Sequence, residues 1–126
     1  MNSDKAPSEP LWGWVQITAG VGPVECQWTV AQVFAALRTE AEAAGITLDL
    51  LDAVPGEAAD TLRSVLLAAR GPAASLPTFF TGWAGSVQWR GRSPFRPQHR
   101  RRSFFVGVEV LQPPDTRAAT LDPRDL

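Results

Sequence analysis

Cysteine, histidine and lysine are almost absent from this 126-residue chain, and each scarcity narrows the choice of function. The single cysteine, Cys26, excludes an internal disulfide and a cysteine-based zinc site. The single histidine, His99, has no carboxylate or thiol near it in sequence that would complete a catalytic pair. We therefore expect His99 to form hydrogen bonds rather than catalyse a reaction, and we expect neither a metal site nor a cofactor.

Long apolar runs are missing as well. No segment approaches the ~18 apolar residues of a membrane span, and the first ten residues lack the apolar stretch of a secretory signal. A lone cysteine suits a reducing compartment, so the sequence favours a cytoplasmic protein without a membrane partner. The length and the 44% apolar content suit a monomer with one globular domain.

Positive charge is scarce everywhere except in one segment. Residues 1–89 hold four cations and nine acids, a net charge of −5, whereas residues 90–102 hold six arginines and no acid. Residues 103–126 return to −2, so the overall charge of −1 conceals a strongly basic loop in an acidic chain. Eleven of the twelve cations are arginine, which suits bidentate contacts with phosphates.

This basic segment is the main candidate for a functional site. Arginine neutralises phosphates, and flat side chains stack on unpaired bases, so the composition indicates RNA binding. The alternative is a solvated hairpin tip that keeps a sheet edge soluble. The residues that we assign to nucleic-acid binding are Arg90, Arg92, Phe95, Arg96, Gln98, His99, Arg100, Arg101 and Arg102.

The hydrophobic pattern predicts an α+β fold with a mostly antiparallel sheet, because strands and helices alternate without regular βαβ spacing. Residues 61–70 alone are ambiguous, since they fit both a helical period and a short buried strand. Residues 1–10 and 113–126 read as a disordered tail and a linker, which leaves residues 11–112 as the domain. Strands are expected at residues 11–19, 46–53, 86–89 and 103–111, and helices at residues 23–44 and about 77–83.

The first helix carries several local signals. Pro23 suits the first helical position, Glu25 complements the helix dipole, and Gly45 suits the C-terminal cap. Cys26 falls on the apolar face of this helix, so core packing is expected rather than a reactive thiol. The glycines before Pro23 lack the motif of a phosphate-binding loop and predict a tight turn. The apolar face comprises Cys26, Val30, Val33, Phe34, Leu37 and Ala41.

Five segments, in this order and with matching gaps, resemble the release factor H family of peptide chain release factor-like proteins. The resemblance covers about residues 14–112, and the most specific element is SPFRPQHR after the strand that ends in Gln-Trp. The matching segments are residues 17–26 (ITAGVGPVEC), 61–64 (TLRS), 83–89 (WAGSVQW), 93–100 (SPFRPQHR) and 105–108 (FVGV).

The resemblance implies the fold of the codon-recognition domain of class I release factors, with helices packed on one face of a sheet. It also implies that residues 61–69 form a strand. The basic loop would take the place of the stop-codon-reading loop and face the decoding-region RNA of the small ribosomal subunit. The family is associated with ribosomes whose decoding-centre RNA is cut, and with an RNA ligase that repairs such cuts.

Three features depart from the family. Gln98 replaces a usual second histidine, and Ser103-Phe104 replaces a usual Asn-Trp. The Gly-Gly-Gln motif, through which release factors hydrolyse peptidyl-tRNA, does not occur in the sequence. We therefore expect a recognition domain that is not itself an enzyme. The alternative function is a protein-interaction module that docks a separate Gly-Gly-Gln domain or the RNA ligase.

Overall fold

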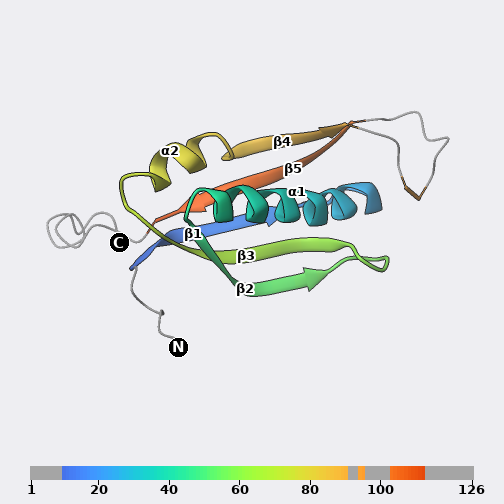
Figure 1. The fold of residues 1–126 in the computed structure, drawn as a ribbon. Coiled ribbons are helices and arrows are strands. Elements are labelled where there is room, and N and C mark those ends of the chain that lie inside the picture. Colours follow the sequence, from blue (N-terminus) through green and yellow to red (C-terminus); the bar gives the residue numbers. More distant parts are fainter. Residues whose placement is uncertain (1–9, 91–93, 96–102, 113–126) are drawn as a thin grey trace, which may run out of the picture.

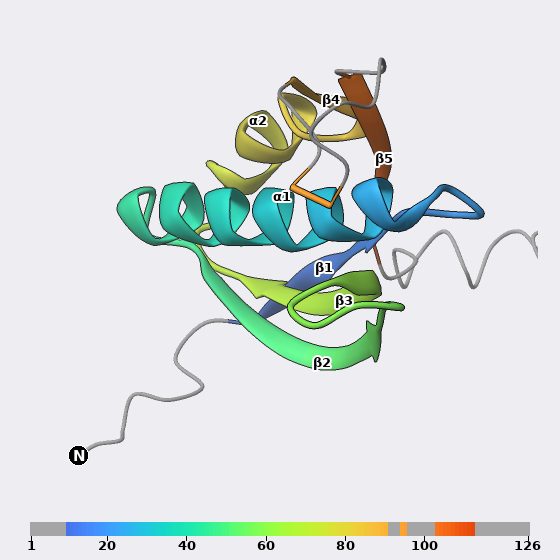
Figure 2. The same cartoon turned by 90° about the vertical axis from the view of Figure 1, so that its right-hand side faces the viewer.

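Five strands form one antiparallel sheet in the computed structural model, which describes residues 10–90, 94–95 and 103–112. Two helices lie on one face of this sheet (Figures 1 and 2). The order of the strands is β2-β3-β1-β5-β4, and every pairing is antiparallel. This architecture confirms the predicted α+β class. The elements are β1 (Leu11–Thr18), α1 (Val24–Ala43), β2 (Thr47–Pro55), β3 (Leu62–Arg70), α2 (Leu76–Thr81), β4 (Gly85–Arg90) and β5 (Ser103–Leu111).

The ambiguous segment at residues 61–70 is a strand, β3, as the family resemblance implied. β3 lies between β2 and β1, so both of its edges are paired. Val65 and Leu67 are buried beneath the helices, and Ala68 is buried on the opposite face. A strand that is buried on both faces carries a continuous apolar run, which explains why its sequence also fitted a helical period.

α1 begins one residue later and ends one residue earlier than predicted. Pro23 is the N-cap, with an extended ψ of 178°, and the helix starts at Val24. At the other end Gly45 has a φ of 77°, and its N–H donates to the Glu42 carbonyl. The N–H of Ile46 donates to the Ala41 carbonyl at 2.8 Å. These two bonds form a Schellman motif, which turns the chain directly into β2.

The core lies between α1 and the sheet, and α2 closes one end of it. Val15 and Ile17 of β1 are completely buried against the helix face predicted from the sequence. Phe80 of α2 is buried, and its ring stacks on Trp12 with centroids 5.4 Å apart. A register shift after Leu11 breaks the alternation of β1, and Trp12 packs with the core cluster.

Several boundaries differ slightly from the sequence-based expectation. β2 continues to Pro55, two residues beyond its predicted end, and α2 ends at Thr81. The predicted tails at residues 1–10 and 113–126 lie outside the described residues, apart from Pro10. Neither of the described helices is long and apolar enough to cross a membrane.

Candidate nucleic-acid interface

The hairpin of β4 and β5 determines where the basic segment leaves the sheet. Six residue pairs join the two strands, and the last pair is Arg90 with Ser103. The two strand ends are therefore neighbours, and residues 91–102 connect them at this end of the sheet. In Figure 1 this is also the end at which α1 begins.

The structure describes only two of the nine residues assigned to nucleic-acid binding. Arg90 is exposed at the end of β4. Phe95 is 37% exposed, so part of its ring is open to solvent. The other seven lie outside the described residues, and they are Arg92, Arg96, Gln98, His99, Arg100, Arg101 and Arg102.

A pair of tryptophans joins this hairpin to α1. Trp28 of α1 and Trp89 of β4 meet edge to face, with ring centroids 5.9 Å apart and an interplanar angle of 88°. Both residues are half-buried, and Trp89 also packs against the core cluster. The structure thus gives Trp89 a packing role at the base of the hairpin.

The glycine-rich segment before α1 is the predicted tight turn. Gly20 has a φ of 61°, and its N–H donates to Thr18 Oγ1 at 3.0 Å. A Cβ at Gly22 would lie 2.7 Å from Cys26 Sγ, so the turn passes too close to α1 for a side chain there. Cys26 itself is only 4% exposed, which confirms its predicted place in the core.

Buried polar side chains brace the loop between β2 and β3 against the start of α1. Gln27 is 1% exposed, and its Oε1 accepts the Glu57 N–H at 2.8 Å. Thr61 is 4% exposed, and its hydroxyl donates to the Ala58 carbonyl at 2.6 Å. A Cβ at Gly56 would overlap Thr61 Oγ1 and lie 2.7 Å from Gln27 Oε1. This loop is therefore fixed beside the start of α1, at the end of the domain that carries the basic segment.

The burial of Glu25, in the first turn of α1, was not expected from the sequence. Glu25 was predicted as an acid that complements the helix dipole, and it does lie in the first turn. The structure also buries it completely, and it takes part in an interaction. A buried carboxylate requires such compensation, so Glu25 belongs to the interior of this end of the domain rather than to its surface.

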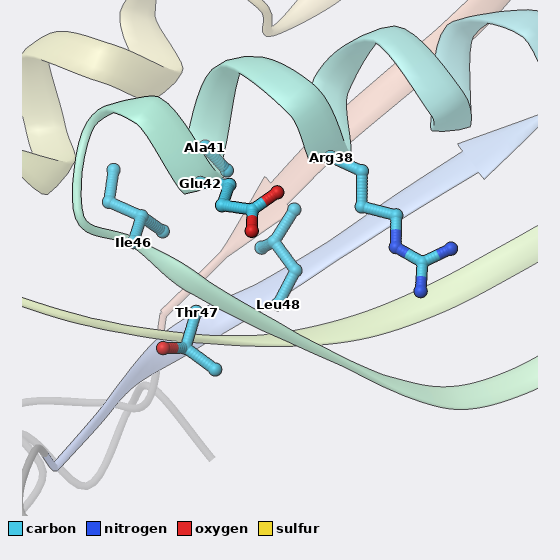
Figure 3. Close-up of a pocket in the computed structure, with 6 residues that line it drawn as sticks. All are labelled: Arg38, Ala41, Glu42, Ile46, Thr47 and Leu48. Atoms are coloured by element: carbon cyan, nitrogen blue, oxygen red, sulfur yellow. The ribbon is translucent and has the colours of Figure 1, made fainter.

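The other end of α1 carries a hollow of about 330 Å³ between the helix and β2. Figure 3 shows Arg38 and Glu42 reaching from α1 on this side, with Leu48 between them in the view. The Arg38 guanidinium lies 5.0 Å from the centroid of the Phe34 ring. This hollow does not adjoin the hairpin end, and we assign it no role in nucleic-acid binding.

Among the described residues, no group of histidine, cysteine, aspartate and glutamate side chains could hold a metal ion.

Comparison with known proteins finds relatives among the peptide chain release factors. It is 33% identical over 94 residues to the peptide chain release factor homolog of Escherichia coli. This chain is homologous to peptide chain release factors. It is also 31% identical over 121 residues to peptide chain release factor 2 of Chloroflexus aggregans. No family model matches the chain.

The homology covers only part of these release factors. The alignments span 75% and 95% of this chain, but 45% of the Escherichia coli protein and 32% of the Chloroflexus aggregans protein. The chain thus spans less than half the length of the curated relatives it matches. RF2 of Thermus thermophilus has the same fold over 85% of this chain and 30% of its own, with a TM-score of 0.71 and 23% identity.

Proposed function

We propose that this release factor-like domain recognises the ribosome, and that residues 90–102 contact RNA of the small-subunit decoding region. One observation carries the proposal: the only strongly basic segment of the sequence connects two paired strand ends at one end of a release factor-like fold. In this proposal residues 11–112 make up the recognition domain.

The chemistry of the segment suits RNA. The six arginines would neutralise phosphates and release counterions, which supplies affinity without sequence preference. Phe95, Gln98 and His99 would contact bases by stacking and hydrogen bonding. The acidic charge of residues 1–89 repels phosphates from the rest of the domain, so it would orient the basic end towards the RNA.

The resemblance to release factor H makes the proposal more specific. We infer that the preferred target is a cytoplasmic ribosome whose decoding-centre RNA has been cut, and that the protein acts in rescue. Peptidyl-tRNA hydrolysis would then depend on a Gly-Gly-Gln motif outside these 126 residues, since the sequence contains none. An RNA repair ligase would act on the same ribosomes.

A second candidate function is the docking of a protein, such as a Gly-Gly-Gln domain or the ligase. The face of the sheet opposite the helices supports it, because Phe105 is 46% exposed and Leu111 is 43% exposed there. Binding through such a face would depend little on salt, whereas binding through the arginines would weaken steeply as salt increases.

The test is binding of the chain to purified small ribosomal subunits, with intact and with cut decoding-centre RNA, over a series of salt concentrations. Replacing Arg100, Arg101 and Arg102 with alanine should weaken binding. It should also reduce the slope of log affinity against log salt by roughly 0.7–0.9 per arginine that contacts a phosphate. Equal affinity for intact and cut subunits would reject the rescue role, but it would leave the proposed RNA contact of residues 90–102 standing.

The matched control removes three arginines from elsewhere in the domain, Arg38, Arg63 and Arg70. Arg63 and Arg70 form exposed ion pairs with Glu57 and Asp49, and exposed pairs contribute little to stability. If this triple variant loses as much affinity as the first, binding reflects net charge, and the assignment of residues 90–102 is wrong.

A further inference from the structure

A second hollow lies at the end of the domain away from the basic segment. It has a volume of about 370 Å³ and lies between the C-terminal half of α1, the end of α2 and β4. Figures 1 and 2 both show α2 beside this half of α1. Its lining residues are Glu40, Phe79, Gly82, Trp83 and Val87.

A hydrogen bond joins two of these side chains, Trp83 and Glu40. The Trp83 indole N–H donates to Glu40 Oε1 at 3.2 Å, which holds the carboxylate beside the indole ring. Glu40 is exposed, while Trp83 and Phe79 are half-buried, so a carboxylate and two aromatic rings share one opening to solvent. In the described part of the chain, no cation forms an ion pair with Glu40.

The end of α1 adds further negative charge. Its last turn contains no basic residue, although cations are favoured there because the helix dipole is negative at its C-terminus. Glu40 and Glu42 lie close to this end instead, and their charges add to that of the dipole. On the β2 side, Arg38 shares its hollow with Glu42, as Figure 3 shows. Among the described residues, no cation lines the hollow at Glu40.

We propose that this hollow binds a basic side chain of a partner protein, with the cation between the Glu40 carboxylate and the rings of Trp83 and Phe79. An arginine guanidinium fits best, because it pairs with a carboxylate and also stacks on aromatic faces. RNA is disfavoured, because its phosphates would be repelled by the same charges that attract a cation. This site is independent of the proposed ribosomal RNA contact, and it carries the opposite charge.

The test uses the full chain and a blocked Gly-Arg-Gly tripeptide as the probe. The readout is the NMR resonance of the Trp83 indole N–H, which a Trp83→Phe variant assigns. We expect a saturable shift with the arginine peptide, a smaller one with a lysine peptide, and none with a citrulline peptide. Citrulline has nearly the shape of arginine but no charge. Absence of a saturable shift, or an equal shift with citrulline, would overturn the proposal.

The decisive variant is Glu40→Gln, whose side-chain oxygen can still accept the Trp83 N–H while the negative charge is lost. Affinity for the arginine peptide should fall about two- to fivefold, as for the loss of an exposed ion pair. Unchanged resonances of the other four indoles would show that the variant is folded.

The matched control is Glu109→Gln, which removes an exposed acid from β5 and should leave the affinity unchanged. Equal weakening by Glu109→Gln would mean that the peptide responds to net charge alone, and the site would be rejected. A saturable shift of the Trp83 resonance on addition of a short oligouridine would assign the hollow to RNA and would also overturn the proposal.

Discussion

A single side chain placed at residue 56 would disturb the loop that braces the start of α1. A Cβ there would overlap Thr61 Oγ1 and would lie 2.7 Å from Gln27 Oε1, and both groups are buried and hydrogen-bonded. We predict that Gly56→Ala lowers the free energy of unfolding by about 1–3 kcal/mol, the usual cost of overpacking. Urea unfolding followed by tryptophan fluorescence measures this change.

The control for this prediction is Gly82→Ala, at the C-cap of α2. The φ of Gly82 is −75°, and the nearest atom to its added Cβ would lie 3.7 Å away. Alanine fits there without strain and restricts the unfolded chain, so stability should stay the same or rise slightly. A Gly56→Ala protein as stable as Gly82→Ala would show that the loop readjusts freely.

The sequence predicted some residue roles and missed others for a physical reason. Cys26 and Gly45 were placed correctly, because periodicity and capping depend on residues a few positions apart. The roles of Gln27 and Thr61 were missed. Gln27 bonds to a loop thirty residues away, and a local pattern contains no information about such a contact. The one available signal was a glutamine beside the apolar face of a helix.

At the level of elements, the contact between Trp28 and Trp89 determines how the β4–β5 hairpin is held against α1. An edge-to-face pair of this kind contributes about 0.5–1.5 kcal/mol beyond the area that it buries. We predict a coupling free energy of this size in a double-mutant cycle of Trp28→Leu and Trp89→Leu, measured by urea unfolding.

The control cycle pairs Trp89→Leu with Trp14→Leu. Trp14 is half-buried in β1, and its strand partners Leu111 and Ala68 do not include any residue of β4. Its effect should add to that of Trp89→Leu within about 0.3–0.5 kcal/mol. Equal coupling in the two cycles would mean that no specific clamp joins Trp28 to the hairpin.

Elements were predictable wherever one face is buried and the other is exposed. β5 spans the residues expected for it, because its buried Phe104, Val106 and Val108 alternate with other residues. β3 was not predictable from its pattern, since burial on both faces removes the alternation, and the family resemblance identified it instead. The contact of Trp89 with Trp28 depends on a neighbouring helix, so no local pattern could predict it.

For the molecule as a whole, the sequence revealed the separation of charge but not its arrangement in space. The basic segment could be recognised from its composition alone. The strand ends that flank it lie near the start of α1, because of the register of β4 and β5 and the contact of Trp28 with Trp89. The acidic end of α1 was missed, because Glu40 acquires its aromatic neighbours only when α2 packs against the helix.

The last prediction concerns what this polypeptide does on a ribosome by itself. If residues 90–102 hold it at the decoding region, it should occupy the small subunit without releasing the nascent peptide. Hydrolysis requires a positioned water at the distant ester bond, and a domain of this size has a radius of gyration of only ~13 Å. In the release factor family, the Gly-Gly-Gln loop performs this step, and the sequence has no such motif.

Two measurements on stalled ribosomes with cut decoding-centre RNA test this division of labour. The polypeptide alone should give no peptide release above the spontaneous rate, and it should slow release by a complete release factor in proportion to its occupancy. The variant that lacks Arg100, Arg101 and Arg102 should compete less well, because it would lose the proposed phosphate contacts. Release by the polypeptide alone would contradict the proposed role. Competition that is unaffected by the three substitutions would mean that another surface of the domain holds it on the ribosome.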